Sequence, residues 1–166
     1  GQEGRWPDCD MLPMNVLGYG WGKMDDPDNK GWKCKFTQEE TRTMITLWSI
    51  FRAPLMIGTD LPKLDDFNLS LLTNEEILAM DKNPLQAYQA NGSCHDNVVT
   101  WINECPDGKS YYECFFNLSE EDQTIRLNLQ IGKSDNIRDL WERKDLGSKA
   151  EFTLAPHACK ALKINL

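Results

Sequence analysis

A loop near the N-terminus carries the residues best suited to chemistry. The segment RWPDCDMLPM, positions 5–14, holds an indole, two acids separated by one residue, a thiol and two thioethers. An ionised carboxylate in such a loop can form strong hydrogen bonds with the hydroxyl groups of a ligand. However, Pro followed by Asp is a common turn, a loop acid is commonly solvated, and Trp with Met commonly belongs to a core. From spacing alone, a structural role is the favoured interpretation.

Other chemical motifs fail on their spacing. The run DDPDNKG at 25–31 imitates the start of a calcium loop, but Lys30 occupies a ligand position and Thr37 stands where a bidentate Glu belongs. The glycines of GYGWG lack the strand and helix context of a dinucleotide site. With only His95 and His157, both in the second half of the chain, no His-based triad is evident.

Composition excludes several classes of partner. The 166 residues carry a net charge of -8, which argues against a phosphate-binding surface and therefore against nucleic acid. No apolar run is long enough to span a bilayer, and the N-terminus lacks a basic and apolar signal pattern, so we expect a soluble chain without a membrane partner. The cellular compartment stays open.

The cysteines predict neither a metal site nor a redox motif. Both need short, repeated spacings, and the six cysteines contain no C-x-x-C pair: Cys9, Cys34, Cys94, Cys105, Cys114 and Cys159. Buried or free thiols are the favoured interpretation, while disulfides stay open. Three N-x-S sequons, at Asn68, Asn91 and Asn117, matter only in a secreted eukaryotic protein.

The first half of the chain predicts helices and one strand. Thr37 and Glu40 form a capping box, followed by an apolar helical face made of Met44, Leu47, Trp48 and Phe51. This helix should end near Ala53, because Pro54 disfavours helical geometry before it. The segment PLMIG, 54–58, is typical of a short, fully buried strand.

Two short helical pieces should follow, with a bend between them. Asn68 and Thr73 are the cap candidates, and Thr73 with Glu76 repeats the capping box. Strands that alternate with helices indicate an α/β architecture with parallel strands. Because parallel strands need cover on both faces, we expect residues 1–84 to be the last part of a larger α/β unit.

The hydrophobic period changes to that of strands near Pro84. Inward and outward positions alternate along two segments, with these inward residues: Tyr112, Cys114, Phe116 and Leu118, then Ile125, Leu127, Leu129 and Ile131. Pro106 to Gly108 should form a turn between two strands, and His157 another. Further strands are expected at NIRDLWER, EFTLA and CKALKIN. About seven short strands predict a β-sandwich.

Three motifs together resemble one known family. They are W-P-D-C-D-M-L at 6–12, a T-x-x-E helix that ends in L-W-S-I-F-R-A-P-L-M-I-G at 47–58, and L-L-T-N-E-E-I-L-A-M at 71–80. Their order and spacing resemble the closing third of an α-galactosidase of the melibiase type, glycoside hydrolase family 27. The resemblance implies the final βα units of a (β/α)₈ TIM barrel over residues 1–84, and a C-terminal antiparallel β-sandwich over 85–166.

The resemblance also implies a role for the acidic loop in binding a sugar. Asp10 and Met11 are expected to line the pocket for a terminal α-linked galactose or a related sugar. Asp8 is expected to orient loop backbone or a neighbouring polar group, and Trp6 to pack the pocket wall. In that family the two carboxylates of the retaining mechanism come from the fourth and sixth strands. The chain should therefore contain no catalytic residue, be inactive alone, and need no metal or organic cofactor.

Two further hypotheses stay open. One makes the β-half a non-catalytic carbohydrate-binding or interdomain packing module, with Tyr88, Trp101, Tyr111 and Trp141 as candidate aromatic contacts. The other treats the chain as a complete small protein whose barrel-like part serves assembly, so that an oligomer is expected. In the favoured hypothesis, the partners are a carbohydrate substrate and the rest of the barrel upstream.

Overall fold

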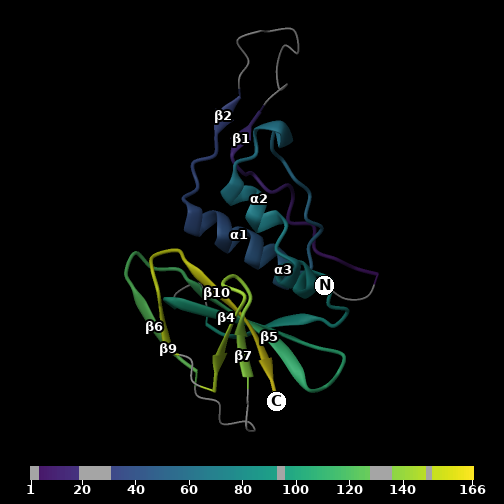
Figure 1. Cartoon of the computed structure of the whole chain (residues 1–166), viewed down its shortest axis with the longest axis vertical. Coiled ribbons are helices and arrows are strands. Elements are labelled where there is room, and N and C mark those ends of the chain that lie inside the picture. The colour runs from purple at the N-terminus through teal and green to yellow at the C-terminus, as the bar shows by residue number, and fades with distance from the viewer. Residues whose placement is uncertain (1–3, 19–30, 93–95, 128–135, 149–150) are drawn as a thin grey trace.

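The computed structural model describes residues 4–18, 31–92, 96–127, 136–148 and 151–166. Helices lie on one face of an antiparallel sheet, and a small hairpin lies beyond the helices (Figure 1). The described elements of the first half are β1 (Val16–Leu17), β2 (Trp32–Lys33), α1 (Gln38–Phe51), the 3₁₀ helix η1 (Leu61–Lys63), α2 (Asp66–Leu72) and α3 (Glu75–Asp81). Those of the second half are β3 (Ala87–Asn91), β4 (Val98–Glu104), β5 (Ser110–Asn117), β6 (Gln123–Arg126), β7 (Asn136–Asp139), β8 (Lys144–Gly147), β9 (Glu151–Leu154) and β10 (Cys159–Asn165).

Helix α1 begins and ends close to where its sequence predicts. Both bonds of the capping box form, from the Glu40 N–H to Thr37 Oγ1 (3.2 Å) and from the Thr37 N–H to a Glu40 carboxylate oxygen (2.7 Å). The helix ends at Phe51, followed by Arg52 in the left-handed conformation (φ 61°) and then by Pro54. Its apolar face packs against β4, β5 and β10.

The N-cap of α2 differs from the prediction. Asp65 caps this helix, because its carboxylate accepts the Asn68 N–H at 2.8 Å. The same oxygen accepts the side-chain NH₂ of Asn68, which is therefore buried inside the first turn rather than placed before it. The prediction of Asn68 as a cap was wrong by three residues.

The predicted capping box at the start of α3 does not form. Thr73 ends α2, and Asn74 caps α3 by accepting the N–H groups of Glu76 (3.0 Å) and the next residue. The Asn74 side chain also donates to the carbonyl of Leu140 in the β-half (2.9 Å). This long-range bond favours Asn74 over Thr73 as the N-cap of α3. A local sequence pattern cannot predict it, because Leu140 lies far away in the sequence.

Residues 54–58, predicted as a fully buried strand, do not form one. The Leu12 N–H donates to the Met56 carbonyl (2.7 Å) and the Gly58 N–H donates to the Leu12 carbonyl (3.1 Å), which makes one isolated parallel bridge. Met56 and Ile57 are 43% and 40% exposed. A buried parallel strand needs neighbours on both edges and cover on both faces. The described residues supply one neighbour, and they contain no parallel sheet.

The second half forms the antiparallel strands that the alternating pattern predicts. Six strands lie in the order β3-β4-β5-β10-β7-β8, and β6 pairs with β9 in a second sheet. The change from helix to strand falls between α3 and β3, around Pro84. The inward positions of β5 are buried as far as Phe116, whereas Leu118 is 49% exposed because the strand has ended. Leu129 and Ile131 lie outside the described residues.

The six-stranded sheet has a hydrophobic core on each face. Successive side chains of a strand point to opposite faces, so β5 contributes Cys114 to one core and Phe115 to the other. The first core continues into the helices. The second is closed by β6 and β9, where the Phe152 ring lies 5.5 Å from that of Phe115. The sheets thus form the predicted β-sandwich, and the helices share a core with it.

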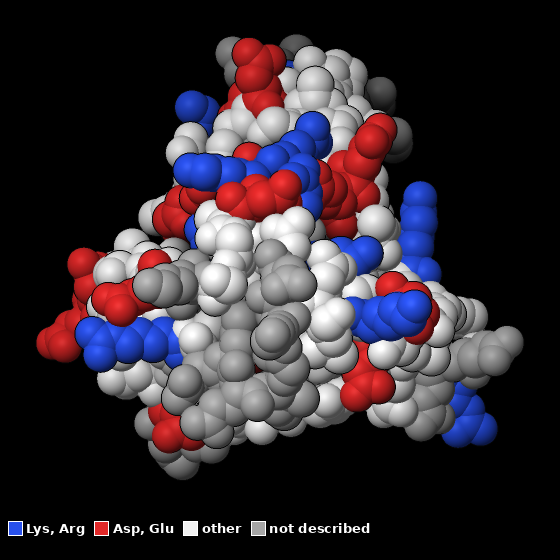
Figure 2. Space-filling model, turned by 60° about the horizontal axis from the view of Figure 1, so that its bottom comes forward, with Lys and Arg blue, Asp and Glu red and all other residues white. Residues whose placement is uncertain are grey.

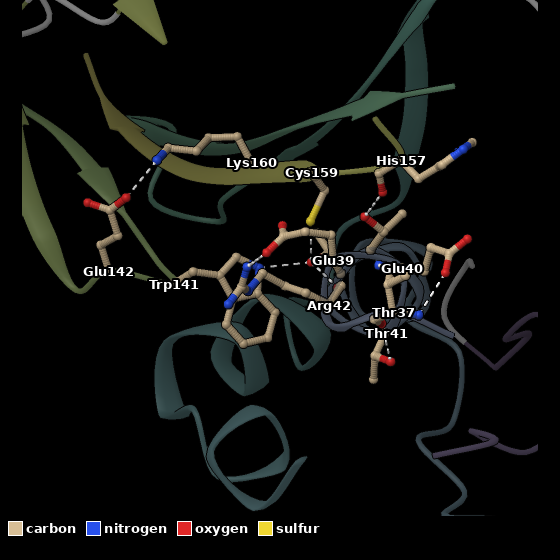
Figure 3. Close-up of polar contacts among 12 residues, drawn as sticks. Thr37, Glu39, Glu40, Thr41, Arg42, Trp141, Glu142, His157, Cys159 and Lys160 are labelled. Atoms are coloured by element: carbon tan, nitrogen blue, oxygen red, sulfur yellow. Dashed lines mark hydrogen bonds and ion pairs between the residues drawn. The ribbon is translucent and has the colours of Figure 1, made fainter. Parts of the chain in front are cut away.

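Polar contacts also join α1 to the sheet (Figure 3). The Thr43 hydroxyl donates to the carbonyl of His157 (2.7 Å), which occupies the predicted turn before β10 at φ 57°. The indole N–H of Trp141 donates to the Thr46 hydroxyl (2.9 Å), which lies 3.2 Å from the thiol of Cys159. These contacts fix the orientation of α1 on the sheet.

A buried pair of amides closes the junction between α3 and the sheet. The side-chain NH₂ of Asn83 donates to the side-chain oxygen of Asn103 and to the carbonyl of Glu104 (2.7 Å). The NH₂ of Asn103 donates to the carbonyl of Leu85 (2.7 Å). Both amides are buried, so their hydrogen bonds replace those that water made in the unfolded chain.

Charges of both signs are interspersed on the surface (Figure 2), and the described cysteines are not oxidised to disulfides. In the face shown by Figure 2, Lys and Arg lie among Asp and Glu rather than in a continuous basic area. All five cysteines in the described ranges are free thiols, and Cys94 lies outside those ranges. No helix in the described part of the chain is long and apolar enough to cross a membrane.

Candidate functional site

A hollow of about 710 Å³ opens at the end of the molecule that carries the β1–β2 hairpin. Two of the predicted site residues, Asp10 and Met11, line it. The remaining walls come from β1, from the segment around β2 and from residues 57–62. The hollow therefore collects side chains from three stretches that lie far apart in the sequence.

Asp10 occupies a strained backbone position in this hollow. Its φ of 66° lies in the left-handed region, which costs most residues with a Cβ about 1–2 kcal/mol and costs Asp less, because its short side chain can hydrogen-bond locally. The Asp10 N–H donates to Asp8 Oδ1 (2.9 Å), and the Met11 N–H donates to Asp10 Oδ1 (2.7 Å). From α1, the Trp48 indole N–H reaches the Asp10 carbonyl at 3.4 Å. Neighbouring groups on both sides thus hold Asp10 in an unfavourable conformation, as is common in functional loops.

Met11 depends on the absence of a side chain at Gly58. A Cβ at Gly58 would lie 2.9 Å from Met11 Cβ and 3.3 Å from the Leu12 carbonyl oxygen. The Met11 side chain lies against Gly58. It is also 46% exposed and lines the hollow. Gly58 is therefore a spacing requirement of the site.

The opposite wall is fixed to β1 by hydrogen bonds. The Val16 carbonyl accepts the Thr59 hydroxyl (2.7 Å) and the Asp60 N–H (3.0 Å). The Asp60 carboxylate forms an ion pair with Lys63 at 2.9 Å. Asp60 thereby adds a second acid to the lining, with its charge balanced by a partner.

Trp32 forms an aromatic wall of the hollow. It pairs with Leu17 in the β1–β2 hairpin and is 55% exposed. Its ring occupies the space that a Cβ of Gly18 would need, and Gly18 has a φ of 69°. Glycine is thus required at position 18 both for its conformation and for the close approach of the indole.

The other two predicted site residues lie behind or beside the hollow. Asp8 does not line it, but its carboxylate holds the Asp10 N–H. Trp6 is 52% exposed, and its ring lies 6.0 Å from the guanidinium carbon of Arg52 rather than in the lining.

Sequence reasoning missed Trp32, Asp60 and both glycines. Trp32 follows Gly31 directly in a polar segment, and an indole in such a setting was the only local signal for it.

The lining suits a neutral ligand that is rich in hydroxyl groups. Carboxylates accept hydrogen bonds from hydroxyls, while a thioether and an indole contact apolar C–H faces. Within the described ranges, no three His, Cys, Asp or Glu side chains gather closely enough to hold a metal ion. The arrangement can bind and orient such a ligand.

Two of the four aromatic residues considered for a carbohydrate-binding module face inward. The Trp101 ring packs edge-on against Phe51 of α1 at 4.4 Å, and Trp141 bonds to Thr46 of the same helix. Tyr88 is 45% exposed and, with Tyr111, lines a smaller hollow of about 400 Å³ on the sheet.

Known proteins match the chain over both halves. Residues 95–164 match the family described as the α-galactosidase C-terminal β-sandwich domain. The whole-chain relatives include an α-galactosidase of Cyamopsis tetragonoloba, 27% identical over 95% of this chain, and α-galactosidase 3 of Arabidopsis thaliana, 32% identical over 86% of it.

The fold has close counterparts among solved structures. A family 27 β-L-arabinopyranosidase from Geobacillus stearothermophilus is 35% identical over 98% of this chain, with a TM-score of 0.83. The matched region makes up 38% of that enzyme, 36% of the Cyamopsis relative and 30% of the Arabidopsis relative. The chain thus spans about a third of the length of the relatives that it matches.

Proposed function

Because the chain belongs to the α-galactosidase (melibiase) family, glycoside hydrolase family 27, and corresponds to the C-terminal region of such enzymes, we propose that it forms part of a retaining α-galactosidase-like hydrolase. Residues 1–84 are then the last part of a (β/α)₈ barrel, and residues 85–166 its C-terminal β-sandwich domain. The substrate is a terminal α-linked galactose or a related sugar. The nucleophile and the acid/base carboxylate lie in a part of the barrel outside this chain.

The constrained conformation of Asp10 is the observation that carries this proposal. Asp8 and Trp48 hold the Asp10 backbone at φ 66°, and the Asp10 carboxylate accepts the Met11 N–H, so this side chain has lost much of its freedom before any ligand arrives. Such preorganisation reduces the entropy that binding would otherwise cost. The parallel bridge between Leu12 and Ile57 supports the barrel, since neighbouring barrel strands pair in this way.

Each predicted site residue receives a role in this proposal. Asp10 accepts hydrogen bonds from sugar hydroxyls, and Met11 contacts an apolar face of the same sugar. The Asp8 carboxylate positions Asp10 by accepting the backbone N–H of Asp10. Trp6 packs against Arg52 outside the lining of the hollow, so its role is to support the loop rather than to contact the sugar.

The decisive experiment uses the longest natural polypeptide that carries this sequence. It should hydrolyse an aryl α-galactoside, and this 166-residue chain alone should not. Asp10→Asn should lower kcat/KM by roughly 10- to 100-fold, because a hydrogen bond to a charged group is worth about 1.5–3 kcal/mol. Glu121→Gln, at an exposed loop position, is the matched control. Hydrolysis by the short chain alone, or an Asp10→Asn variant with full activity, would refute the proposal.

A second candidate function is that of a carbohydrate-binding β-module. The exposed ring of Tyr88 and the hollow that it shares with Tyr111 favour it. Under this hypothesis, Tyr88→Ala should abolish saturable binding of galactosides to the chain while Asp10→Asn leaves it intact. The opposite pattern supports the hydrolase pocket.

A further inference from the structure

Asn91 and Gly92 form the only Asn–Gly pair of the chain, and they lie where β3 ends. β3 is an outer strand of the six-stranded sheet, and Asn91 is exposed there. The proposed function makes no use of this pair. An exposed asparagine that precedes glycine can react with its own backbone, because glycine has no side chain to obstruct the attacking nitrogen.

The fold requires glycine at position 92. Gly92 has a φ of 86°, and a Cβ there would lie 2.8 Å from the Val98 carbonyl oxygen and 3.1 Å from Val99 Cα. The register of β3 on β4 shifts just before this point, between Gln89 and Asn91. Because no residue with a side chain fits at position 92, the reactive pair is a consequence of how β3 ends against β4.

The Gln89 side chain lies where it can promote this reaction. Its NH₂ group donates to the Asn91 carbonyl (3.3 Å) and to the Gly92 carbonyl. The Asn91 carbonyl belongs to the same peptide group as the Gly92 nitrogen, so loss of the Gly92 N–H proton spreads negative charge over both atoms. A donor to that oxygen stabilises the charge and makes the nitrogen easier to ionise.

Buried asparagines are protected from the same reaction. Asn117 is 1% exposed, and its NH₂ group donates to three backbone carbonyls. The buried amides of Asn83 and Asn103 are likewise held by hydrogen bonds. Asn165, in contrast, is exposed at the end of β10, and a leucine follows it. Asn165 therefore shares the exposure of Asn91 and lacks only the glycine, which makes it an internal comparison.

The Asp–Gly pair at 107–108, which could form the same ring, is constrained by its turn. The Asp107 carboxylate accepts the N–H groups of Lys109 (2.8 Å) and Ser110 (2.9 Å) and the Ser110 hydroxyl (2.8 Å). These hydrogen bonds lower the pKa of Asp107 and keep the carboxylate ionised. A carboxylate that is ionised and held in place is a poor target for a nucleophile.

We propose that Asn91 is a self-modification site, which converts spontaneously to aspartate and isoaspartate with the help of Gln89. The Gly92 nitrogen attacks Asn91 Cγ, so a C–N bond forms and closes a cyclic imide. The Cγ–Nδ2 bond breaks, and the side-chain nitrogen takes up a proton and leaves as ammonia. Water then opens the imide at one of its two carbonyls, which gives either aspartate or isoaspartate. Water is the only co-reactant, and no group is oxidised or reduced.

Both products change the edge of the sheet. Aspartate adds a negative charge to a chain whose net charge is already -8. Isoaspartate also inserts one carbon into the main chain, so position 91 can no longer lie opposite Thr100 in the present register. In the described part of the sheet, β3 pairs with β4 alone. The modification should therefore loosen β3 and leave the rest of the sandwich folded.

The test follows the modification in the longest natural polypeptide that carries this chain. The purified protein is incubated in buffer, and peptide mapping by mass spectrometry measures the converted fraction of each asparagine over time. Asn91 should convert first, and Asn165 should stay intact while most of Asn91 is lost. The rate should increase with pH, because loss of the Gly92 N–H proton produces the nucleophile. Asn91→Gln should abolish the new acidic species.

A substitution at Gln89 separates the effect of the fold from that of the sequence. Gln89→Met keeps the length of the side chain but cannot donate, and it should slow conversion about two- to tenfold, the rate equivalent of one hydrogen bond. In concentrated urea the contact is absent, so Gln89→Met should convert as fast as the natural sequence. Gln38→Met, at an exposed position that starts α1, is the matched control and should change neither rate.

The outcomes are distinguishable. If Asn91 persists as long as Asn165, the modification site is refuted. If folded Gln89→Met converts at least as fast as the natural sequence, or if it slows the reaction equally in urea, the role of Gln89 is refuted. None of these results depends on the sugar site, so the inference and the proposed function stand or fail independently.

Discussion

Glu113 allows a quantitative test of the packing of the β-half. Its carboxyl lies on the face of β5 that carries Phe115, between Ile102 of β4 and Leu162 of β10 in the cross-strand register. Burial raises the pKa of this carboxyl from its ordinary value of 4.5 to about 7. The folded protein therefore keeps a proton that the unfolded chain releases.

The sign and size of the effect follow from this difference. Between pH 4.5 and about 7 the folded state binds more protons, so the free energy of unfolding falls as pH rises through this window. The destabilisation caused by ionising Glu113 is complete above this pH window and absent below it. At ~1.4 kcal/mol per pKa unit this destabilisation would reach about 3.5 kcal/mol, and partial exposure of the carboxyl reduces it to about 1–2 kcal/mol.

Glu113→Gln removes the charge and keeps the shape of the side chain. We expect the free energy of unfolding, from urea denaturation of the chain, to rise by about 1–2 kcal/mol near pH ~8.5 and by less than ~0.5 kcal/mol near pH ~4.5. Glu121→Gln, at an exposed position, should show no such difference between the two conditions. An equal effect of Glu113→Gln at both pH values, or a loss of stability at high pH, would refute the reasoning.

Two further substitutions test the site and the junction. Gly58→Ala should displace Met11 and raise the inhibition constant for galactose in the longest natural polypeptide at least about fivefold. It should also lower the free energy of unfolding by about 1–3 kcal/mol, because the new Cβ meets Met11 Cβ and the Leu12 carbonyl oxygen. Unchanged inhibition would contradict the packing described for Met11. Asn103→Leu leaves the buried amide of Asn83 without its side-chain acceptor and should lower the free energy of unfolding by about 1–3 kcal/mol. The double variant with Asn83→Leu should regain part of this loss in the same urea assay, and a fully additive loss would argue against the pair.

Elements whose determinants are local were predictable from the sequence. The capping box of Thr37 and Glu40 spans three residues, and its two hydrogen bonds form whenever the helix does. The alternation along β5 likewise reports its two faces directly. The cap of α3 was mispredicted because the choice between Thr73 and Asn74 depends on the distant Leu140 carbonyl. The cap of α2 was mispredicted although its bond, from the Asn68 N–H to Asp65, is local.

The candidate site was predictable only where one short motif contains it. The family resemblance of the acidic loop pointed to Asp10 and Met11, which line the same hollow. Trp32 and Asp60 reach that hollow from segments some 20 and 50 positions away, and no periodicity links them. Hydrogen bonds from residues 59 and 60 to the Val16 carbonyl bring Asp60 to the hollow, and the pairing of β1 with β2 brings Trp32 there. Both sets of contacts are visible only in the folded chain.

The two-sided attachment of α1 limits how evolution or engineering can recombine this region. Trp48 on this helix reaches the loop of Asp10, while Thr46 and Phe51 contact aromatic residues of the β-half, Trp141 in a turn and Trp101 in β4. A crossover at the helix-to-strand boundary would graft foreign strands onto a helix shaped for different partners. Chimaeras that keep α1 together with its own β-sandwich should therefore fold, whereas chimaeras joined at position 84 should not.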